Sequence, residues 1–327
     1  MPATLRVGLI GVGRWGKVYI QTLLSMNKRC RITHLGTGNP QHAGLLPYPV
    51  EVMTDWHKLI SSDCDAVIIA TPPRTHAEIL EACLEAGKPC IVEKPLCLDV
   101  ETAERIHRRV EEANVPVLVD HTYLFNSAYR ALKHTIREQN EQVRFLLSEG
   151  VQLGPFRTHT PTLWDWGPHD LSLCLDLVGE VPISVSALAG PLDPRGDPEL
   201  LSIRLEFPGG TCAWIQVGRL APHKRRTLSA FTDSHLYVWD DTAAEPLMVS
   251  SAEFSEREIG GIPEGLEQHP IPVARHQPPM TNLLTYFLDG LTGGDRRYFG
   301  THLAVEVIHL LAHCDTLIKQ AGAPSPP

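Results

Sequence analysis

Apolar runs and amphipathic segments alternate along the first third of the chain. Runs rich in valine, isoleucine and leucine, bounded by glycine, proline or charged residues, are typical of buried parallel strands. Such strands are predicted at residues 5–11, 31–36, 66–71, 90–94 and 116–123. Helices are predicted between them at residues 17–26, 55–61, 75–87 and 99–114. This strand–helix order with short connections predicts a parallel, doubly wound α/β sheet.

The pattern changes after Asn126. A helix is predicted at 127–139, and apolar and polar residues then alternate in short segments separated by proline and glycine. These segments are 143–152, 181–189, 201–207, 211–217, 227–231 and 236–239, and a last helix is predicted at 303–320. Period-two alternation predicts an open-faced, mainly antiparallel sheet. We therefore predict a doubly wound domain over residues 1–122 and an α+β domain over residues 123–327.

The composition is that of a folded globular protein with an acidic surface. A chain of 327 residues suits two domains of ordinary size. The 43% hydrophobic and 20% charged residues argue against a disordered chain. The net charge of −9 argues against nucleic acid or an anionic membrane as the main partner. No apolar run reaches the roughly 18 residues that a membrane helix requires.

The N-terminus and the cysteines indicate a cytoplasmic protein. The chain starts with a strand and a turn, and it carries no signal-peptide cleavage site. The 8 cysteines include no C-x-x-C pair, which favours buried reduced thiols over disulfides or zinc ligands. We therefore expect no metal site.

Three glycines follow the first predicted strand in the sequence GVGRWG. Gly11 permits a tight turn, Gly13 lets a pyrophosphate approach the backbone, and Gly16 lets the helix pack closely on the strand. The N-terminus of the helix then faces the phosphates. Because the motif lies between a strand and a helix, it predicts a Rossmann dinucleotide site. The residues between the glycines complete the predicted loop: Val12, Arg14 and Trp15.

The position that usually holds the adenosine ribose is not acidic in this chain. A carboxylate is expected at the end of the second strand, but Thr37 occupies the position, followed by Gly38 and Asn39. Without the carboxylate the site does not repel a 2′-phosphate, and no adjacent arginine or lysine binds one. The residues leave NAD(H) and NADP(H) both open as the cofactor. A short helix broken by two prolines is predicted at 39–50.

The sequence TPPRTH follows the third predicted strand at its carboxyl end. Ligands bind at this edge of an open α/β sheet, so a stiff loop here can line the nicotinamide ribose. The candidate contacts are Thr71, Pro72 and His76. The alternative is a plain turn ahead of a helix.

The sequence EKP ends the next strand and contributes Glu93 and Lys94 to the predicted cofactor site. Pro95 disfavours helical geometry at Lys94, so the lysine side chain should project into the crevice. A lysine there can hydrogen-bond a substrate hydroxyl and stabilise the charge that develops on it. A solvated lysine at a strand end is the alternative.

The sequence WDWGPHD combines a helix start with two ionisable residues. Pro168 suits the first turn of a helix, with Gly167 or Asp165 as its cap. Asp165 and His169 are four residues apart, so both can face one side. A first-turn position would disfavour the imidazolium of His169 by about 0.3–1 kcal/mol, although neighbouring Asp170 opposes this effect. A plain cap and a packed polar histidine are the alternative.

These four motifs, in this order, resemble the glucose–fructose oxidoreductase / inositol dehydrogenase / rhizopine catabolism (Gfo/Idh/MocA) family, over residues 5–318. The resemblance implies that Lys94, Asp165 and His169 form the catalytic set. It also implies a nicotinamide dinucleotide cofactor. The family's second domain carries an open-faced sheet that binds substrate and pairs subunits, which implies a homodimer or homotetramer.

Two longer strings, residues 119–130 and 163–180, look like the subgroup that acts on nucleotide-linked or amino sugars. If so, four residues are candidate contacts to substrate or nicotinamide: His121, Tyr123, Asn126 and Arg157. The absence of an acid at Thr37 departs from the family pattern and leaves the adenine side open.

The sequence thus predicts hydride transfer between a nicotinamide dinucleotide and a ring carbon of a sugar, nucleotide sugar or polyol. Three alternatives stay open. One is a cofactor-dependent glycosidase of the same fold, and another is a reductase of a different carbonyl or imine. The third is a non-catalytic dinucleotide sensor or scaffold, which would not need Lys94, Asp165 or His169.

Overall fold

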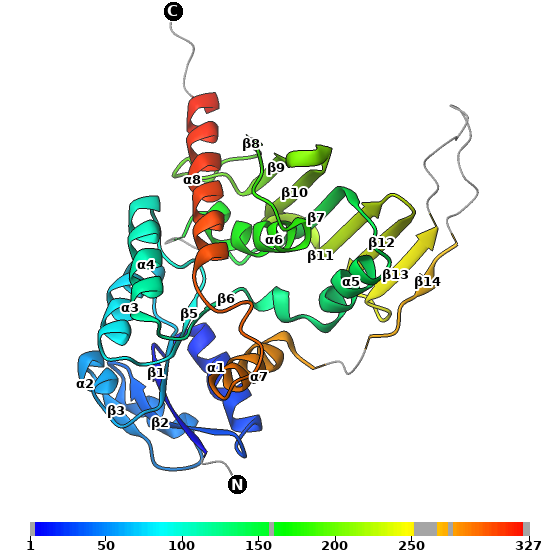
Figure 1. Ribbon diagram of the computed structural model, residues 1–327. Helices are drawn as coiled ribbons and strands as arrows, with labels where there is room; N and C mark the ends of the chain where they lie inside the picture. The colour runs from blue at the N-terminus through cyan, green and yellow to red at the C-terminus, as the bar shows by residue number, and fades with distance from the viewer. Residues whose placement is uncertain (1–3, 157–159, 252–266, 274–276, 323–327) are drawn as a thin grey trace, which may run out of the picture. The chain divides into compact units, whose positions relative to one another are not determined.

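The computed structural model describes residues 4–156, 160–251, 267–273 and 277–322, and Figure 1 shows their helices and strands. The chain forms two compact units, each described here by itself. Unit 1 comprises Met1–Thr122 and Pro278–Ile308, and unit 2 comprises Tyr123–Gln277 and His309–Pro327. The sequence assigned all of 123–327 to one domain, whereas residues 278–308 lie in unit 1. No helix in the described part of the chain is long and apolar enough to cross a membrane.

Unit 1 contains a six-stranded parallel sheet in the order β3-β2-β1-β4-β5-β6. Its strands are β1 (Leu5–Ile10), β2 (Cys30–Gly36), β3 (Glu51–Met53), β4 (Ala66–Ile69), β5 (Cys90–Glu93) and β6 (Val117–Asp120). The residues of β4, β5 and β6 are all buried, as their continuous apolar runs predict for strands covered on both faces. This order is that of the dinucleotide-binding Rossmann sheet, and the predicted α/β fold is confirmed.

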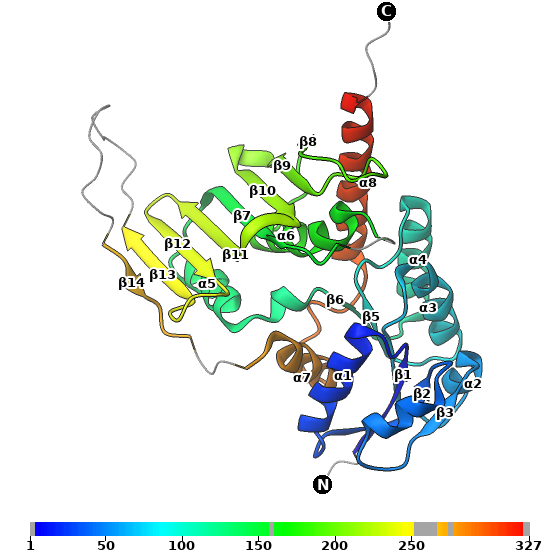
Figure 2. The same ribbon diagram turned by 180° about the vertical axis from the view of Figure 1, so that it is seen from behind.

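Helices cover both faces of this sheet, as the two opposite views in Figures 1 and 2 show. Helices α1 (Arg14–Ser25) and α7 (Pro279–Leu291) pack together. Helices α2 (Trp56–Ile60), α3 (His76–Glu85) and α4 (Val100–Ala113) form a second group. Buried side chains of β4, α3 and α4, such as Ile69, Leu80 and Ile106, form one continuous core. The predicted helix at 39–50 is a shorter 3-10 helix, Pro40–Leu45, because its prolines do not continue an α-helix.

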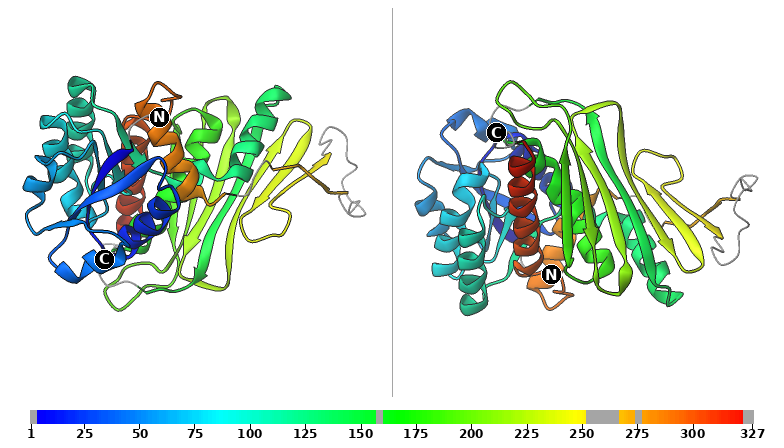
Figure 3. Two further views of the ribbon diagram at one scale, coloured as in Figure 1. Left: turned by 90° about the horizontal axis from the view of Figure 1, so that it is seen from below. Right: turned by 90° about the horizontal axis from the view of Figure 1, so that it is seen from above.

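Unit 2 contains an eight-stranded mixed sheet in the order β14-β13-β12-β11-β7-β10-β9-β8. Its strands are β7 (Val143–Leu153), β8 (Ser184–Ala189), β9 (Leu200–Glu206), β10 (Cys212–Gly218), β11 (Leu220–Thr232), β12 (His235–Asp240), β13 (Leu247–Ser251) and β14 (His269–Pro270). The pair β7–β10 is parallel, and the other neighbours are antiparallel. Helices α5 (Ser127–Glu138) and α6 (Thr162–Val178) pack on one face, and Figure 3 shows the other face open.

Helix α6 begins earlier than the sequence predicts. Its cap is Pro161, and Pro168 lies inside the helix instead of in its first turn. An internal proline typically costs about 3 kcal/mol, but most of α6 is buried, so packing outweighs this cost. His169 therefore lies near the middle of the helix, and the proposed effect of the helix dipole on a first-turn His169 is wrong.

Candidate functional site

The glycine loop has the geometry that a pyrophosphate needs. Gly11 has a φ of 96°, and an added Cβ would meet the carbonyl oxygen of Ala70 at 2.5 Å. A Cβ on Gly16 would meet the Gly11 oxygen at 2.1 Å, so both residues must be glycine. Around Gly13, by contrast, a Cβ would meet nothing within 4 Å, and Gly13 is the cap of α1. The loop therefore leaves open backbone at a helix N-terminus, which fits a dinucleotide phosphate.

The rest of the predicted loop is partly exposed and free of acidic residues. Arg14 is exposed, Trp15 is half-buried and Val12 is buried. The first turn of α1 contains no acidic residue, so it presents no carboxylate to an anion.

The end of β2 carries hydroxyl and imidazole groups in place of a carboxylate. The Thr37 hydroxyl lies 2.9 Å from Nδ1 of His42, and it accepts from the Asn39 backbone N–H at 3.3 Å. Gly38 is exposed and has open space at its Cβ position. A ribose can approach this edge, and no acid at Thr37 repels a 2′-phosphate.

His76 supports the cofactor-side loops from inside unit 1. It is fully buried, and its Nδ1 and Nε2 lie 2.9 Å and 2.7 Å from the carbonyl oxygens of Pro95 and Thr71. Burial lowers the pKa of His76. The sequence predicted a cofactor contact, and in unit 1 the ring links the Thr71 loop to the segment after β5, where a neutral imidazole donates its single N–H to one of the two carbonyl oxygens. A structural role thus accounts for this side chain, while Pro72 in the same loop is exposed.

Glu93 ends β5 and is also buried, although the sequence placed it among the cofactor contacts. Its in-register neighbour on β6 is Asp120, which accepts hydrogen bonds from Tyr19 of α1 and from Thr122. Burial raises the pKa of Glu93 well above its usual range, and the charge of Asp120 adds to the increase. Lys94 follows directly, is 8% exposed, and lowers the pKa of both carboxyls through its positive charge.

In unit 2, Asp165 and His169 lie one helical turn apart on α6. Asp165 is 3.7 Å from Arg219, whose side chain is completely buried in the turn between β10 and β11. Arg219 also lies 3.8 Å from Glu199 and donates to the Thr160 carbonyl at 2.8 Å. A buried guanidinium requires such partners. Arg219 therefore fixes the carboxylate of Asp165 within unit 2.

An aromatic and charged cluster surrounds His169. Its ring contacts the Tyr123 ring edge to face, with 5.1 Å between centroids. The guanidinium of Arg226 lies 4.6 Å from the centre of the Tyr123 ring and 5.8 Å from that of Trp166. Arg226 also forms a buried ion pair with Asp170. The sequence analysis missed Arg219 and Arg226 because they are more than fifty residues away from Asp165 and Asp170, their partners. The acid beside His169 was one available signal, since a buried carboxylate needs a cation.

The structure describes two of the three remaining predicted substrate contacts, Asn126 and His121. Asn126 caps α5 by accepting from two backbone N–H groups, and its amide donates to Asp241 at 2.9 Å. These bonds and the burial of the residue give Asn126 a structural role in unit 2, and its contact with substrate or nicotinamide stays a prediction. His121 is buried, and Arg157 lies outside the described residues.

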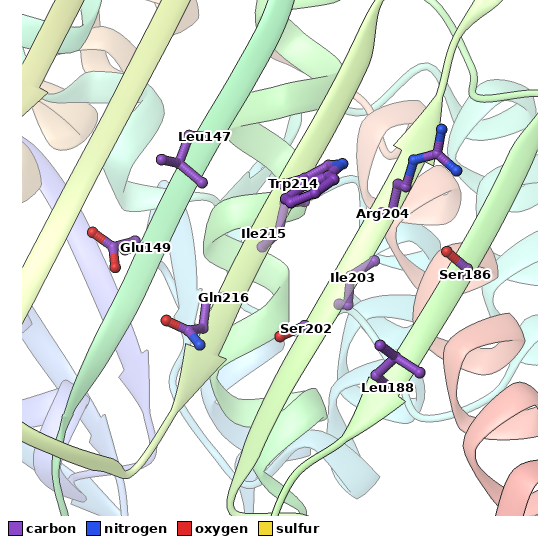
Figure 4. Close-up of a pocket in the computed structure, with 10 residues that line it drawn as sticks. All are labelled: Leu147, Glu149, Ser186, Leu188, Ser202, Ile203, Arg204, Trp214, Ile215 and Gln216. Atoms are coloured by element: carbon purple, nitrogen blue, oxygen red, sulfur yellow. The ribbon is translucent and has the colours of Figure 1, made fainter. Parts of the chain in front are cut away.

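The open face of the second sheet carries a hollow of about 420 Å³. Cross-strand partners line it in two rows, Leu147–Trp214–Arg204–Ser186 and Glu149–Gln216–Ser202–Leu188. Figure 4 shows these side chains on the sheet surface. Trp214 is 54% exposed and Leu188 is 70% exposed, so the face has unusually large apolar side chains for a solvated surface.

The strand order and the glycine loop define unit 1 as a dinucleotide-binding Rossmann domain. Comparison with known proteins agrees with this class. Residues 5–121 match the model of the oxidoreductase family with NAD-binding Rossmann fold, Gfo/Idh/MocA. Residues 157–237 match the Gfo/Idh/MocA C-terminal domain.

Relatives extend the similarity over nearly all of the chain. An oxidoreductase structure from Magnetospirillum magnetotacticum MS-1 is 34% identical, covers 95% of this chain and 100% of its own, and has a TM-score of 0.85. Inositol 2-dehydrogenase from Rhizobium meliloti is 29% identical over 67% of this chain and 70% of that protein. UDP-N-acetylglucosamine 3-dehydrogenase from Acidithiobacillus ferrooxidans is 23% identical over 93% and 96%, respectively. The chain belongs to the Gfo/Idh/MocA family of NAD(P)-dependent oxidoreductases, which confirms the resemblance.

Proposed function

We propose that this protein catalyses reversible hydride transfer between a nicotinamide dinucleotide and a hydroxyl-bearing ring carbon of a sugar, nucleotide sugar or polyol. The observation that carries the proposal is that this chain of an oxidoreductase family contains all three residues that the resemblance assigns to catalysis: Lys94, Asp165 and His169. The relatives named for inositol and for UDP-N-acetylglucosamine support the substrate class. The similarity of residues 119–130 and 163–180 to the nucleotide-sugar and amino-sugar subgroup favours a nucleotide-linked substrate.

Each of the three residues has one role. His169 takes the proton of the substrate hydroxyl during oxidation and returns it during reduction. Asp165, held by Arg219, orients the imidazole. Lys94 donates a hydrogen bond to the same oxygen and stabilises its developing negative charge. The nicotinamide ring, when bound, accepts or supplies the hydride at C4.

The two units divide the work in this proposal. Unit 1 holds the dinucleotide through the Gly11–Gly16 loop, with Thr37 beside the adenosine ribose and Thr71 and Pro72 beside the nicotinamide ribose. Unit 2 supplies Asp165, His169 and the aromatic ring of Tyr123 to the sugar. His121, Asn126 and Arg157 stay candidate substrate contacts.

The test is a screen of inositols and nucleotide sugars by absorbance of the reduced nicotinamide, with NAD and NADP in parallel. On an accepted substrate, Lys94→Ala and His169→Ala should lower kcat by about 10²–10⁴-fold. Matched controls are Lys58→Ala and His134→Ala, which change exposed side chains outside the proposed set. Wild-type turnover in the Lys94 or His169 variant would refute the assignment.

The same screen separates the alternatives. Stoichiometric formation of reduced cofactor with a ketone product supports the dehydrogenase. Hydrolysis without net cofactor reduction would instead show a glycosidase. Binding of dinucleotide without turnover of any sugar would show a sensor.

We further propose that two copies associate through the open face of the second sheet, and that the protein acts in the cytoplasm. The exposed Trp214 and Leu188 support the first point, and the free thiols of all 8 cysteines support the second. Trp214→Glu should lower the mass in light scattering to that of a single chain, whereas Leu98→Glu, at another exposed apolar residue, should not. An unchanged mass for Trp214→Glu would contradict the interface.

A further inference from the structure

Two carboxylic acids lie side by side at the carboxyl ends of β5 and β6. Glu93 and Asp120 are in-register partners in a parallel pair, so their side chains leave the same face of the sheet. Glu93 is 5% exposed and Asp120 is completely buried. Water therefore screens little of the repulsion between two negative charges at this place, and ionising both carboxyls would be costly.

The hydrogen bonds distinguish the two acids. Both oxygens of Asp120 accept a hydrogen bond, one from the hydroxyl of Thr122 at 2.5 Å and the other from the hydroxyl of Tyr19. Oε1 of Glu93 has no hydrogen-bond partner among the described residues, while the Glu93 and Asp120 side chains are hydrogen-bonded to each other. An acceptor-only Asp120 and a proton-carrying Glu93 satisfy this pattern.

The positive charge of Lys94 favours one negative charge on the pair. Lys94 is the adjacent residue, is largely buried, and interacts electrostatically with both carboxyls. Other titratable groups near the pair include the hydroxyl of Tyr19, whose pKa is raised by burial, and the imidazole of His76 beyond Lys94, and the buried His121 follows Asp120 directly in the chain. None of these groups supplies a negative charge at neutral pH, and protonating both acids would remove the negative charge of the pair from beside the Lys94 ammonium, which is costly for a buried cation.

We propose that Glu93 and Asp120 share a single proton, and that the one negative charge left on the pair keeps Lys94 an ammonium ion positioned for the substrate oxygen. Both acids are positioning residues, since they act through Lys94. Burial raises the pKa of both carboxyls, which agrees with one retained proton. This proposal rests on the proposed function, in which Lys94 contacts the substrate.

The proposal predicts a specific pattern among amide variants. Glu93→Gln leaves the negative charge on Asp120, and Asp120→Asn leaves it on Glu93. Either single variant should therefore lose only several-fold in kcat. The double variant removes both carboxyls of the pair, and its kcat should fall by about 10- to 100-fold, with the alkaline limb of the pH profile displaced to lower pH. Glu78→Gln/Glu112→Gln, which removes two exposed acids of the same unit, is the matched control and should not displace that limb.

A second measurement does not depend on turnover or on folding of the double variant. The infrared spectrum of the wild-type protein at neutral pH should contain a protonated carboxyl band that disappears in Glu93→Gln and in Asp120→Asn. A missing band, single variants as impaired as the double, or an unmoved alkaline limb would each overturn the shared proton. Lys94→Ala separates this failure from that of the proposed function: if it remains active, the role of Lys94 itself is wrong. If it is inactive while the double variant resembles wild type, only the shared proton is refuted.

Discussion

Arg226 donates a hydrogen bond to Asp170 at 2.5 Å, and both side chains are buried in unit 2. Ser148 donates to the other carboxylate oxygen at 2.7 Å, and Gly150 leaves the space that the pair occupies, since a Cβ there would lie 2.4 Å from Asp170. The negative charge of Asp170 raises the pKa of Arg226 against the opposing effect of burial. The pair holds the Tyr123 ring that packs on His169.

Removal of Arg226 should destabilise the protein strongly. Arg226→Ala leaves Asp170 as a buried charge without its cation, so we expect a loss of about 3–5 kcal/mol in the free energy of unfolding. Urea unfolding followed by tryptophan fluorescence measures this loss. Arg144→Ala is the control, because its ion pair with Asp233 is about half exposed and should contribute no more than about 1 kcal/mol. Equal losses in the two variants would contradict the importance of burial.

The glycine loop should separate cofactor binding from folding. Gly13→Ala meets no protein atom, so its melting temperature should stay near the wild-type value while dinucleotide affinity falls by about tenfold or more. Gly16→Ala brings a Cβ against the Gly11 oxygen and should lower the melting temperature itself. Calorimetric titration with NAD and thermal unfolding measure the two effects. Gly44→Ala, which is equally unobstructed, should change neither, and undiminished binding by Gly13→Ala would argue against the phosphate site.

An acid at the end of β2 should select between the cofactors. Thr37→Asp places a negative charge where the adenosine ribose is expected, so the affinity for NADP should fall by about tenfold or more through repulsion of the 2′-phosphate. The affinity for NAD should hold or rise. Dissociation constants for both dinucleotides test this, with Gln21→Glu on the exposed side of α1 as the control for added charge. Equal losses for NAD and NADP would place the ribose elsewhere.

The raised pKa of Glu93 predicts the direction in which the free energy of unfolding changes with pH. The folded pKa lies above the unfolded value of about 4.3, so this contribution to stability is fully present below pH ~4.3 and is lost as pH rises through the folded pKa. Glu93→Gln remains uncharged, so its free energy of unfolding relative to wild type should increase as pH rises from about 4.5 to 8. Unfolding curves across this range are the measurement. If the stability of Glu93→Gln relative to wild type decreased as pH rises, the pKa of Glu93 would be lowered in the folded protein and not raised.

Local sequence patterns predicted the elements that have a long, uninterrupted signal. The apolar runs gave β1, β2, β4, β5 and β6, because strands covered on both faces must be apolar along their whole length. The strand β3 was missed because three residues carry no recognisable period. Helix α7 was also missed, since prolines at its start look like a loop although they suit a helix N-terminus.

In the candidate site, too, local features could be predicted from the sequence and long-range contacts could not. Gly11 and Gly16 could be predicted from the chain because backbone geometry restricts these positions to glycine, and Gly13 because an approaching phosphate needs open backbone. Asn126 and His76 are predicted to contact ligands, and the structure adds that each hydrogen-bonds a distant group of its own unit. Neither distant partner is visible in a local motif.

The sequence by itself determined the Rossmann pattern, the family and the candidate trio of Lys94, Asp165 and His169, since these depend on residue type and local spacing. Only the tertiary structure decided what surrounds them. It pairs Glu93 with Asp120 across two strands, and Arg219 with Asp165 across more than fifty residues of chain. Such long-range pairs determine the charge of a buried site because, away from water, the state of an ionisable group depends on its nearest neighbours.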